Sequence, residues 1–579
     1  MSLPDDSSSS TPLVARIRRG WLAACSVLLV AAMLAPAQRA AAQAIERPAD
    51  DRPQLPTFET PEEQEPVLPP VEPPSAPLEQ LTTGLGVFVE RYDIEGSTVF
   101  TQAELQAAVA PWTNKTIRSE DLVDVRNALT KLYVEQGYVN SGAFLPDQDV
   151  QDGSVRLRII EGSLEQLDIS GNSQFRDSYL KQRIARGAKA PLNVHDLETR
   201  LQILQQDPQI ERVTARLVPG EEPGDAVLKL DVEEASRWRT NLEFSNYEPP
   251  GIGALGGRFE GLFANPAGRG DMLRFLFHGT EGLRRYRGYY DIPFTPRDTR
   301  FSLDARYSSA EAVRSPGKEL DIESSFQSYR IGLRQPVFHT PKELLEVEII
   351  ADWRHTTTEL LGNGFSFPGS GAQDGEATAM VLRFVLDWLR RDRTQVLAAR
   401  AQVSWGIDAL GATINSGGKP DGQFVSWLAQ LQWARRFGRM GIETLFRTDL
   451  QFSSAPLLTM EQIAAGGYAT VRGYRQNQRV QDQAVIASIE TRIPLWRHPQ
   501  RWGVIQLAPF FDVAHLWDHH RRSERRPAKT LASVGVGLRW TMARYLSAQI
   551  YWGQNLTEVI TSGTLQDKGV QFKIEARFP

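Results

Sequence analysis

An aspartate near the C-terminus is the first residue whose position points to specific chemistry. Around it the apolar residues recur at every second position: Ile505, Leu507, Pro509, Phe511 and Val513. This period is typical of a β-strand with one apolar face, so Asp512 and Phe510 lie on the opposite face. An unpaired carboxylate in a confined site is costly. The pattern therefore predicts that Asp512 forms an ion pair.

Other reactive residues do not form a catalytic or metal-binding pattern. His515, His519 and His520 lie near Asp518 but complete no closed ligand set, and an arginine-rich stretch over residues 521–526 is typical of a solvated loop that can meet lipopolysaccharide. The sequence contains no phosphate-binding GxxxxGK[ST] loop and no G-x-S-x-G elbow. We therefore predict no enzyme activity, no metal and no cofactor. The net charge of -5 also argues against nucleic-acid binding.

The N-terminus has the features of an export signal. Arg16, Arg18 and Arg19 precede an apolar run over residues 21–37, and small residues follow it. This run is short for a membrane-spanning helix, so residues 1–44 are predicted to be a signal peptide cut after Ala42 or Ala44. Cys25, the only cysteine, lies inside this segment. The mature chain is then free of disulfides and cysteine nucleophiles.

Residues 45–86 are rich in proline and acidic residues, which predicts an extended periplasmic linker. Two similar α+β units follow, at residues 87–162 and 163–235, each with the order β-α-α-β-β. In the first unit we expect a strand over residues 87–94, a helix capped by Thr101, a helix beginning at Ser119, and strands over 143–145 and 155–160. In the second unit we expect strands over 164–169, 213–218 and 226–232 and helices over 179–184 and 194–205.

From residue 236 to residue 579 the helical spacing gives way to alternation with period two. The last strand is the clearest example, since Val570, Phe572, Ile574, Ala576 and Phe578 alternate with polar residues. Eleven of the thirteen tryptophans lie in this region, which suits the aromatic girdles of a membrane barrel. The mean hydropathy of -0.34 agrees with strands that are apolar on one face only. We predict a transmembrane β-barrel of about 16 antiparallel strands, with a soluble β-sandwich or propeller as the alternative.

The chain after the linker resembles the TpsB transporters of two-partner secretion. The resemblance rests on YVNSGAFLPDQDV over Tyr138–Val150, on NPAGRGD over Asn265–Asp271, on VRGY over Val471–Tyr474 after Gly466-Gly467, and on the F-x-D pattern at Phe510–Asp512. It implies that the two units are POTRA domains and that the barrel exports a large TpsA-type exoprotein: an adhesin, a cytolysin or a toxin. Members of this family often begin with a helix that plugs the barrel, and here prolines occupy that region.

The resemblance also supplies the partner of Asp512. It implies that Arg472 lies at the tip of a loop folded back into the barrel, where its guanidinium can meet the carboxylate in a two-pronged geometry. Gly473 would permit the tight backbone at the tip, and Tyr474 and Phe510 would pack around the pair. Val471, the first residue of the tetrad, belongs to the same predicted site. We interpret the pair as a latch for the loop; a purely structural salt bridge in the lumen is the alternative.

Two further functional alternatives remain open at this stage. An assembly factor that inserts other barrels would share the architecture, and a passive porin would leave the two N-terminal units unexplained. The units themselves offer strand edges to which an unfolded client can add as an extra strand, or they act only as spacers.

Overall fold

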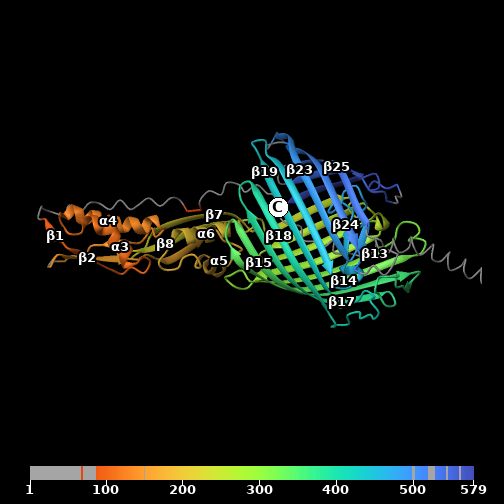
Figure 1. The fold of residues 1–579 in the computed structure, drawn as a ribbon, viewed down its shortest axis with the longest axis horizontal. Coiled ribbons are helices and arrows are strands. Elements are labelled where there is room, and N and C mark those ends of the chain that lie inside the picture. Colours follow the sequence, from red (N-terminus) through yellow and green to blue (C-terminus); the bar gives the residue numbers. More distant parts are fainter. Residues whose placement is uncertain are drawn as a thin grey trace, which may run out of the picture.

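A computed structural model describes residues 67–68, 86–148, 150, 152–498, 502–519, 529–542, 545–559 and 563–579. The predicted signal peptide, nearly all of the linker, His520 and the arginine-rich stretch over residues 521–526 lie outside the described residues. Two α+β units follow one another in a row and lead to one end of a barrel (Figure 1). Among the described residues, no helix has the length and apolar character needed to cross a membrane.

In the described part of the chain, sixteen long antiparallel strands close into a barrel, which confirms the predicted fold. Each strand pairs with the next along the chain, and β27 closes the wall by pairing with β9. A two-residue strand, β16 (Asn363–Gly364), adds to the turn after β15. The long strands are β9 (Trp238–Ser245), β10 (Gly256–Ala264), β11 (Met272–Gly279), β12 (Leu283–Pro293), β13 (Arg300–Glu311), β14 (Ile322–His339), β15 (Glu343–Leu360), β17 (Glu376–Arg391), β18 (Gln395–Ile407), β19 (Val425–Phe437), β20 (Ile442–Ser453), β23 (Gln483–His498), β24 (Gly503–Trp517), β25 (Lys529–Met542), β26 (Leu546–Asn555) and β27 (Val570–Phe578).

The barrel wall separates apolar and polar side chains as the alternation predicts. On β15, Ile349 is 51% exposed on the outer face, whereas Asp352 is fully buried on the inner face. On β27, Ile574 and Phe578 are exposed, and Gln571 and Glu575 are buried. Because successive side chains of a strand point to opposite faces, one sequence builds both a lipid-facing and a lumen-facing surface.

The first unit contains β1 (Val87–Val89), β2 (Arg91–Glu95), α3 (Gln102–Val109), a 3-10 turn η1 (Ala110–Trp112), β3 (Lys115–Ile117), α4 (Ser119–Glu135), β4 (Gly142–Phe144) and β5 (Ser154–Ile160). Thr101 caps α3 as predicted, through a capping box with Glu104. The single strand predicted over residues 87–94 is wrong. The Gly153 carbonyl accepts the N–H groups of Glu90 and Arg91, and the chain is split there. β1 pairs with β3, a strand that the periodicity did not reveal, while β2 joins β5 and β4.

The second unit contains β6 (Ser163–Ser170), α5 (Asp177–Ile184), α6 (Val194–Gln205), β7 (Ile210–Pro219) and β8 (Asp225–Glu234), in the predicted order. Its sheet has the strand order β6-β8-β7, so β7 is an edge strand. α6 covers one face of this sheet with Leu197, Leu201 and Leu204 in the apolar core.

Hydrogen bonds join the two units to one another. The side chain of Asn140, within the YVNSG stretch, donates to the carbonyls of Ser163 and Gly224 at 3.2 and 2.7 Å. The Val194 N–H donates to the Gly137 carbonyl at 2.8 Å. These bonds fix the start of α6 to the end of α4 and keep the units in line.

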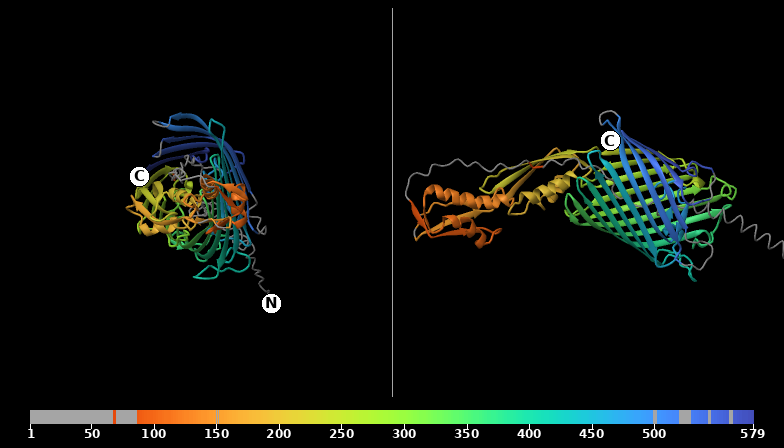
Figure 2. Two further views of the ribbon diagram at one scale, coloured as in Figure 1. Left: turned by 90° about the vertical axis from the view of Figure 1, so that its left-hand side faces the viewer. Right: turned by 45° about the horizontal axis from the view of Figure 1, so that its top comes forward.

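The second unit also contacts the barrel, at turns on the end where β9 begins (Figure 2). The Arg176 N–H donates to the Gly268 carbonyl at 2.9 Å. Arg183 of α5 donates to Asp298 at 2.5 Å, and its guanidinium lies 3.6 Å from the centre of the Tyr179 ring. A Cβ atom on Gly270 would lie 2.2 Å from the Tyr179 hydroxyl, so only glycine allows this close approach. The NPAGRGD turn thus serves as a seat for α5.

Candidate functional site

A loop over residues 454–482, between β20 and β23, contacts the inner face of the barrel; we call it the inward loop. It contains η3 (Thr459–Glu461) and a small sheet of β21 (Ile463–Ala465) and β22 (Arg479–Gln481). The loop begins at the end of the barrel remote from the second unit. Its apolar residues Ile463, Val471 and Tyr474 pack on Ile486, Leu516 and Leu531 of the wall, which accounts for its burial.

At the tip of the inward loop, Arg472 contacts Asp512 on β24 through two hydrogen bonds. Its Nε donates to Asp512 Oδ2 at 2.8 Å, and its Nη2 donates to Oδ1 at 2.9 Å. The Arg472 backbone N–H also donates to Oδ2, at 3.0 Å. Arg472 is only 1% exposed and Asp512 is fully buried. The geometry is the bidentate one that guanidinium favours and ammonium cannot copy.

The wall supplies further partners of Arg472 and Asp512. The sequence predicts Phe510 among them, but not Ser488, Glu490 or Tyr551. Glu490 contacts Nη1 of Arg472, and Ser488 Oγ donates to Asp512 Oδ1 at 2.6 Å. The guanidinium carbon lies 3.8 Å from the Phe510 ring centre and 4.9 Å from that of Tyr551. Two carboxylates and two aromatic rings therefore surround Arg472. Their contacts replace the hydration that the guanidinium loses on burial.

The other residues of the VRGY tetrad have separate roles. Gly473 has a φ of 88°, and a Cβ atom there would lie 2.8 Å from the Gly553 carbonyl oxygen on β26. The Tyr474 hydroxyl donates to the Ala532 carbonyl at 2.8 Å and accepts from the Thr557 N–H at 3.1 Å. Val471 is buried in the apolar cluster under the tip. The tetrad thus provides one cation, one tight turn and two buried anchors.

A second group of buried charges holds the opposite flank of the inward loop. Glu461, in η3, accepts from Arg383 Nη2 at 2.8 and 3.1 Å and lies 3.3 Å from Arg354 Nη1. Both arginines also donate to Asp352 on β15, at 3.0 and 2.8 Å. The strands β15 and β17 that carry this group are not neighbours of β23 and β24. The inward loop is therefore tied to two separate parts of the wall.

Residues after β26 complete the contacts of the tip. Arg475 donates to the Asp567 carboxylate from Nη2 at 2.8 Å, and Gln566 accepts from the Gln476 N–H at 2.9 Å. Neither Asp567 nor Glu461 belongs to a recognisable motif. A signal existed only for Glu490, because strand parity places it on the same inner face as Ser488.

Of the three histidines near Asp518, the structure describes His515 and His519, and these two have separate partners. His515 Nδ1 lies 2.8 Å from Thr530 Oγ1 on an exposed position, and the His519 N–H donates to Asp482 at 3.1 Å. Within the described ranges, no group of three or more His, Cys, Asp or Glu side chains could hold a metal ion. Asp482 also accepts from the Leu457 N–H, so His519 contributes to the stem of the inward loop through its backbone.

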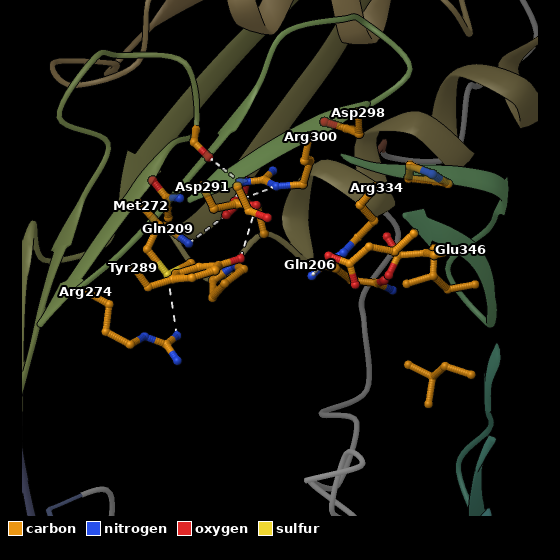
Figure 3. Close-up of a pocket in the computed structure, with 18 of the residues that line it drawn as sticks. Gln206, Gln209, Met272, Arg274, Tyr289, Asp291, Asp298, Arg300, Arg334 and Glu346 are labelled. Atoms are coloured by element: carbon orange, nitrogen blue, oxygen red, sulfur yellow. Dashed lines mark hydrogen bonds and ion pairs between the residues drawn. The ribbon is translucent and has the colours of Figure 1, made fainter. Parts of the chain in front are cut away.

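A cavity of about 990 Å³ lies where the second unit meets the barrel, and its wall continues along the inner faces of β27 and of the strands from β9 to β18. Basic side chains outnumber acidic ones in its lining. Many are paired: Arg300 donates to Asp291 at 2.6 Å, as Figure 3 shows. This polar opening lies at the end of the barrel next to the second unit, opposite the end where the inward loop begins.

A closed barrel with an inward loop, reached through α+β units in series, defines the class of POTRA–barrel outer-membrane proteins. The model of the ShlB-type POTRA domain matches residues 87–162. The model of the haemolysin secretion/activation protein ShlB/FhaC/HecB matches residues 224–540, more than half of the chain. The chain belongs to this family.

Among similar proteins are outer membrane transporters named CdiB. The one from Dickeya dadantii (strain 3937) is 24% identical over 470 residues, which cover 79% of this chain and 80% of that protein. The one from Escherichia coli O6:K15:H31 is 29% identical over 481 residues, covering 81% and 79%. The structure of CdiB from Escherichia coli has a TM-score of 0.67 at 20% identity, over 89% of this chain and 94% of that one. BamA from Haemophilus ducreyi lacking POTRA domains 1-3 has a TM-score of 0.53 at 13% identity, over 85% and 100%, and shares the fold.

Proposed function

We propose that this protein is a two-partner secretion transporter, which takes one large exported protein across the outer membrane in an extended state. The barrel lies in the outer membrane, and the α+β units lie in the periplasm. The observation that carries the proposal is the match of the ShlB/FhaC/HecB family model to a barrel with an inward loop. The similar proteins are transporters, and we propose no enzyme activity for this chain.

The units provide the receptor in this proposal. Residues 87–162 form one POTRA domain, and residues 163–235 form a second, since the order of β6, α5, α6, β7 and β8 repeats the β-α-α-β-β plan. The sheets of both units end in edge strands that can accept an extended client by main-chain hydrogen bonds. The seat of α5 on the barrel turns places the second unit beside the polar opening, so a bound client is delivered to the pore.

The Arg472–Asp512 pair is the latch in this proposal. It fixes the inward loop in one conformation across part of the lumen, and its release allows the loop to move for the client. The sequence contains no GxxxxGK[ST] loop for nucleotide binding. As the family resemblance implies, folding of the client outside the cell supplies direction in this proposal. The partners are thus a TpsA-type exoprotein and the surrounding lipid, including lipopolysaccharide.

A comparison of secreted and outer-membrane proteins tests this function. Whole-proteome mass spectrometry of the parent strain and of a strain lacking the gene should show one large protein missing from the medium, with other barrels unchanged. A joint loss of many barrels would instead identify an assembly factor, the alternative suggested by the fold shared with BamA.

A further inference from the structure

A pocket of about 550 Å³ lies between the second unit and the rim of the barrel, next to the larger cavity described above. Among the described residues that line it, every charged side chain is a cation. Arg186 and Lys189 come from the segment between α5 and α6, Arg200 from α6, and Arg297 from the turn between β12 and β13. The described lining therefore holds no carboxylate to balance these four charges.

The four cations also have no carboxylate partner elsewhere in the described ranges. Asp298, which follows Arg297 in the turn, pairs with Arg183 at 2.5 Å. Arg186 Nη1 donates to the Pro296 carbonyl at 3.2 Å, a neutral partner. Burial and then the positive charges of Arg200 and Arg297 lower the pKa of Arg186, although Asp298 acts in the opposite direction. An anion in the pocket would offset this repulsion.

The pocket reaches the outer side of the barrel wall. Gln335 of β14, which lines it, lies opposite Val347 of β15, and the Val347 side chain is 40% exposed on the lipid-facing surface. Directly opposed residues of an antiparallel pair share one face of the sheet, so Gln335 also points outward. Thr299 Oγ1 donates to Gln335 Oε1 at 2.5 Å, which places Thr299 on the same side. The four cations thus lie beside the membrane as well as beside the lumen.

Exposed apolar side chains border the pocket at the rim. Phe294, in the same turn as Arg297, is 55% exposed, and Val337, two residues after Gln335, is 62% exposed. They mark the periplasmic edge of the apolar band that contacts the acyl chains of the membrane. Cations at this edge lie at the depth of the phospholipid headgroups. Arginine suits such a group, because its planar fork can donate to two phosphate oxygens at once.

We propose that this pocket binds the phosphate headgroup of an anionic phospholipid from the periplasmic leaflet of the outer membrane. Three of its cations belong to the second unit and one belongs to the barrel, so a single headgroup bridges the two parts. The acyl chains lie along Phe294 and Val337. The lipid therefore adds a second tie between α5 and the barrel turns, beside the Arg183–Asp298 pair. This site goes beyond the proposed export function, because no client takes part in it.

Native mass spectrometry of the full-length protein in detergent tests the site. The probes are phosphatidylglycerol and phosphatidylcholine with the same acyl chains. The wild type should bind phosphatidylglycerol about tenfold more tightly, because the choline group adds a positive charge to a pocket of cations. Arg186→Gln with Arg297→Gln should remove most of this preference, since two forks for the phosphate are lost. Arg212→Gln with Lys342→Gln removes the same charge at exposed positions outside the pocket and is the matched control.

Equal affinity of the wild type for the two lipids would overturn the assignment, and this comparison depends on no variant. An equal loss in both double variants would also overturn it, because it would reduce the effect to overall charge. Arg186→Lys with Arg297→Lys keeps the charges without the forks and should retain an intermediate preference. Glycerol phosphate, the headgroup without its chains, should not displace the lipid at equal concentration; displacement would assign the pocket to soluble phosphates instead.

The bridging role has its own measurement. In nanodiscs, hydrogen exchange of residues 177–193 should slow when phosphatidylglycerol replaces phosphatidylcholine, because the headgroup ties this segment to the barrel. The slowing should be absent from the Arg186→Gln, Arg297→Gln variant and present in the Arg212→Gln, Lys342→Gln control. Exchange that is independent of the lipid in the wild type would refute the tie between the second unit and the barrel.

Discussion

Arg472 meets Asp512 through both carboxylate oxygens, with Nε at 2.8 Å from Oδ2 and Nη2 at 2.9 Å from Oδ1. One residue comes from the inward loop and the other from β24, 40 positions further along the chain. Both are buried, so neither charge can exchange its partner for water. Removing one side of such a pair costs about 3–5 kcal/mol, because the other charge stays buried without compensation.

Substitution of Arg472 by alanine should release the tip while the barrel remains inserted. We expect export to fall by about tenfold or more, since the cost of the lost pair exceeds the free energy of a tenfold change in population. The measurement is the amount of client in the medium, with the amount of barrel in outer-membrane fractions beside it. Arg439→Ala, on an exposed turn, is the matched control. Normal export by an inserted Arg472→Ala protein would show that the pair is only structural.

Gly473 should not tolerate a side chain. In Gly473→Ala the new Cβ atom would lie 2.8 Å from both the Gly553 carbonyl oxygen and Asn555 Oδ1, and a φ of 88° adds about 1–2 kcal/mol of strain. The tip must then move away from β26, and export should drop. Gly411→Ala is the control, because Gly411 has a φ of 80° with open space around it. Equal loss in both variants would place the effect in backbone strain alone.

The second anchor of the inward loop predicts a separate effect. In Glu461→Gln, Arg354 and Arg383 lose the charge of Glu461 and keep their ion pairs with Asp352. We expect faster proteolysis within residues 454–482 in intact outer membranes, since one end of the loop is loosened. Glu359→Gln, exposed on the same strand β15, should cleave like the wild type. If Glu461→Gln is cleaved no faster than Glu359→Gln, the loop does not depend on this anchor.

The contact between the second unit and the barrel turns can be tested by charge reversal. Arg183→Glu and Asp298→Arg each replace the 2.5 Å ion pair by two like charges, and each should lower export. The double variant restores opposite charges and should recover part of it. Export is compared with crosslinking between α5 and the barrel turns. If the double variant is inserted in the outer membrane but recovers no export, the Arg183–Asp298 pair is not the contact on which export depends.

The first unit should lose stability in acid through Glu161. Burial raises the pKa of this carboxyl, but hydrogen bonds from Thr98, Tyr133 and the Val99 N–H outweigh it and leave the pKa below its usual value. A lowered pKa in the folded state means that the carboxylate stabilises the fold above about pH 4.3 and that this stability is lost as the pH falls through the lowered pKa.

Glu161→Gln should therefore weaken the first unit by about 1–2 kcal/mol at neutral pH, and the difference from the wild type should shrink in acid. Hydrogen exchange of the first unit, residues 87–162, in the full protein measures it. Glu135→Gln is the control. The Glu135 side chain is 62% exposed, and its ion pair with Lys131, at 3.7 Å, lies on the surface, so the change should alter stability by no more than about 0.5 kcal/mol. A difference that is constant with pH would exclude the carboxylate as its cause.

The sequence by itself determined the local pattern and the order of parts. Alternation assigned the faces of β15 and β27 and placed Asp512 inward, because a strand repeats every two residues wherever it lies. Capping chemistry predicted the start of α3 at Thr101, because the hydrogen bonds of a capping box reach only three residues along the chain. The VRGY tetrad pointed to Arg472 as a partner through a family resemblance, not through spacing.

Only the tertiary structure decided which distant residues meet. Glu461 lies 78 positions from Arg383, and Asp567 lies 92 positions from Arg475; no periodicity relates residues at such separations. The split of the first strand at Glu90 depends on the Gly153 carbonyl, which reaches it from another part of the unit. Leu68 belongs to a segment whose prolines predicted no packed structure, and its burial follows from a groove built by α6 and β7. Contacts of this kind arise from packing, and packing is a property of the whole fold.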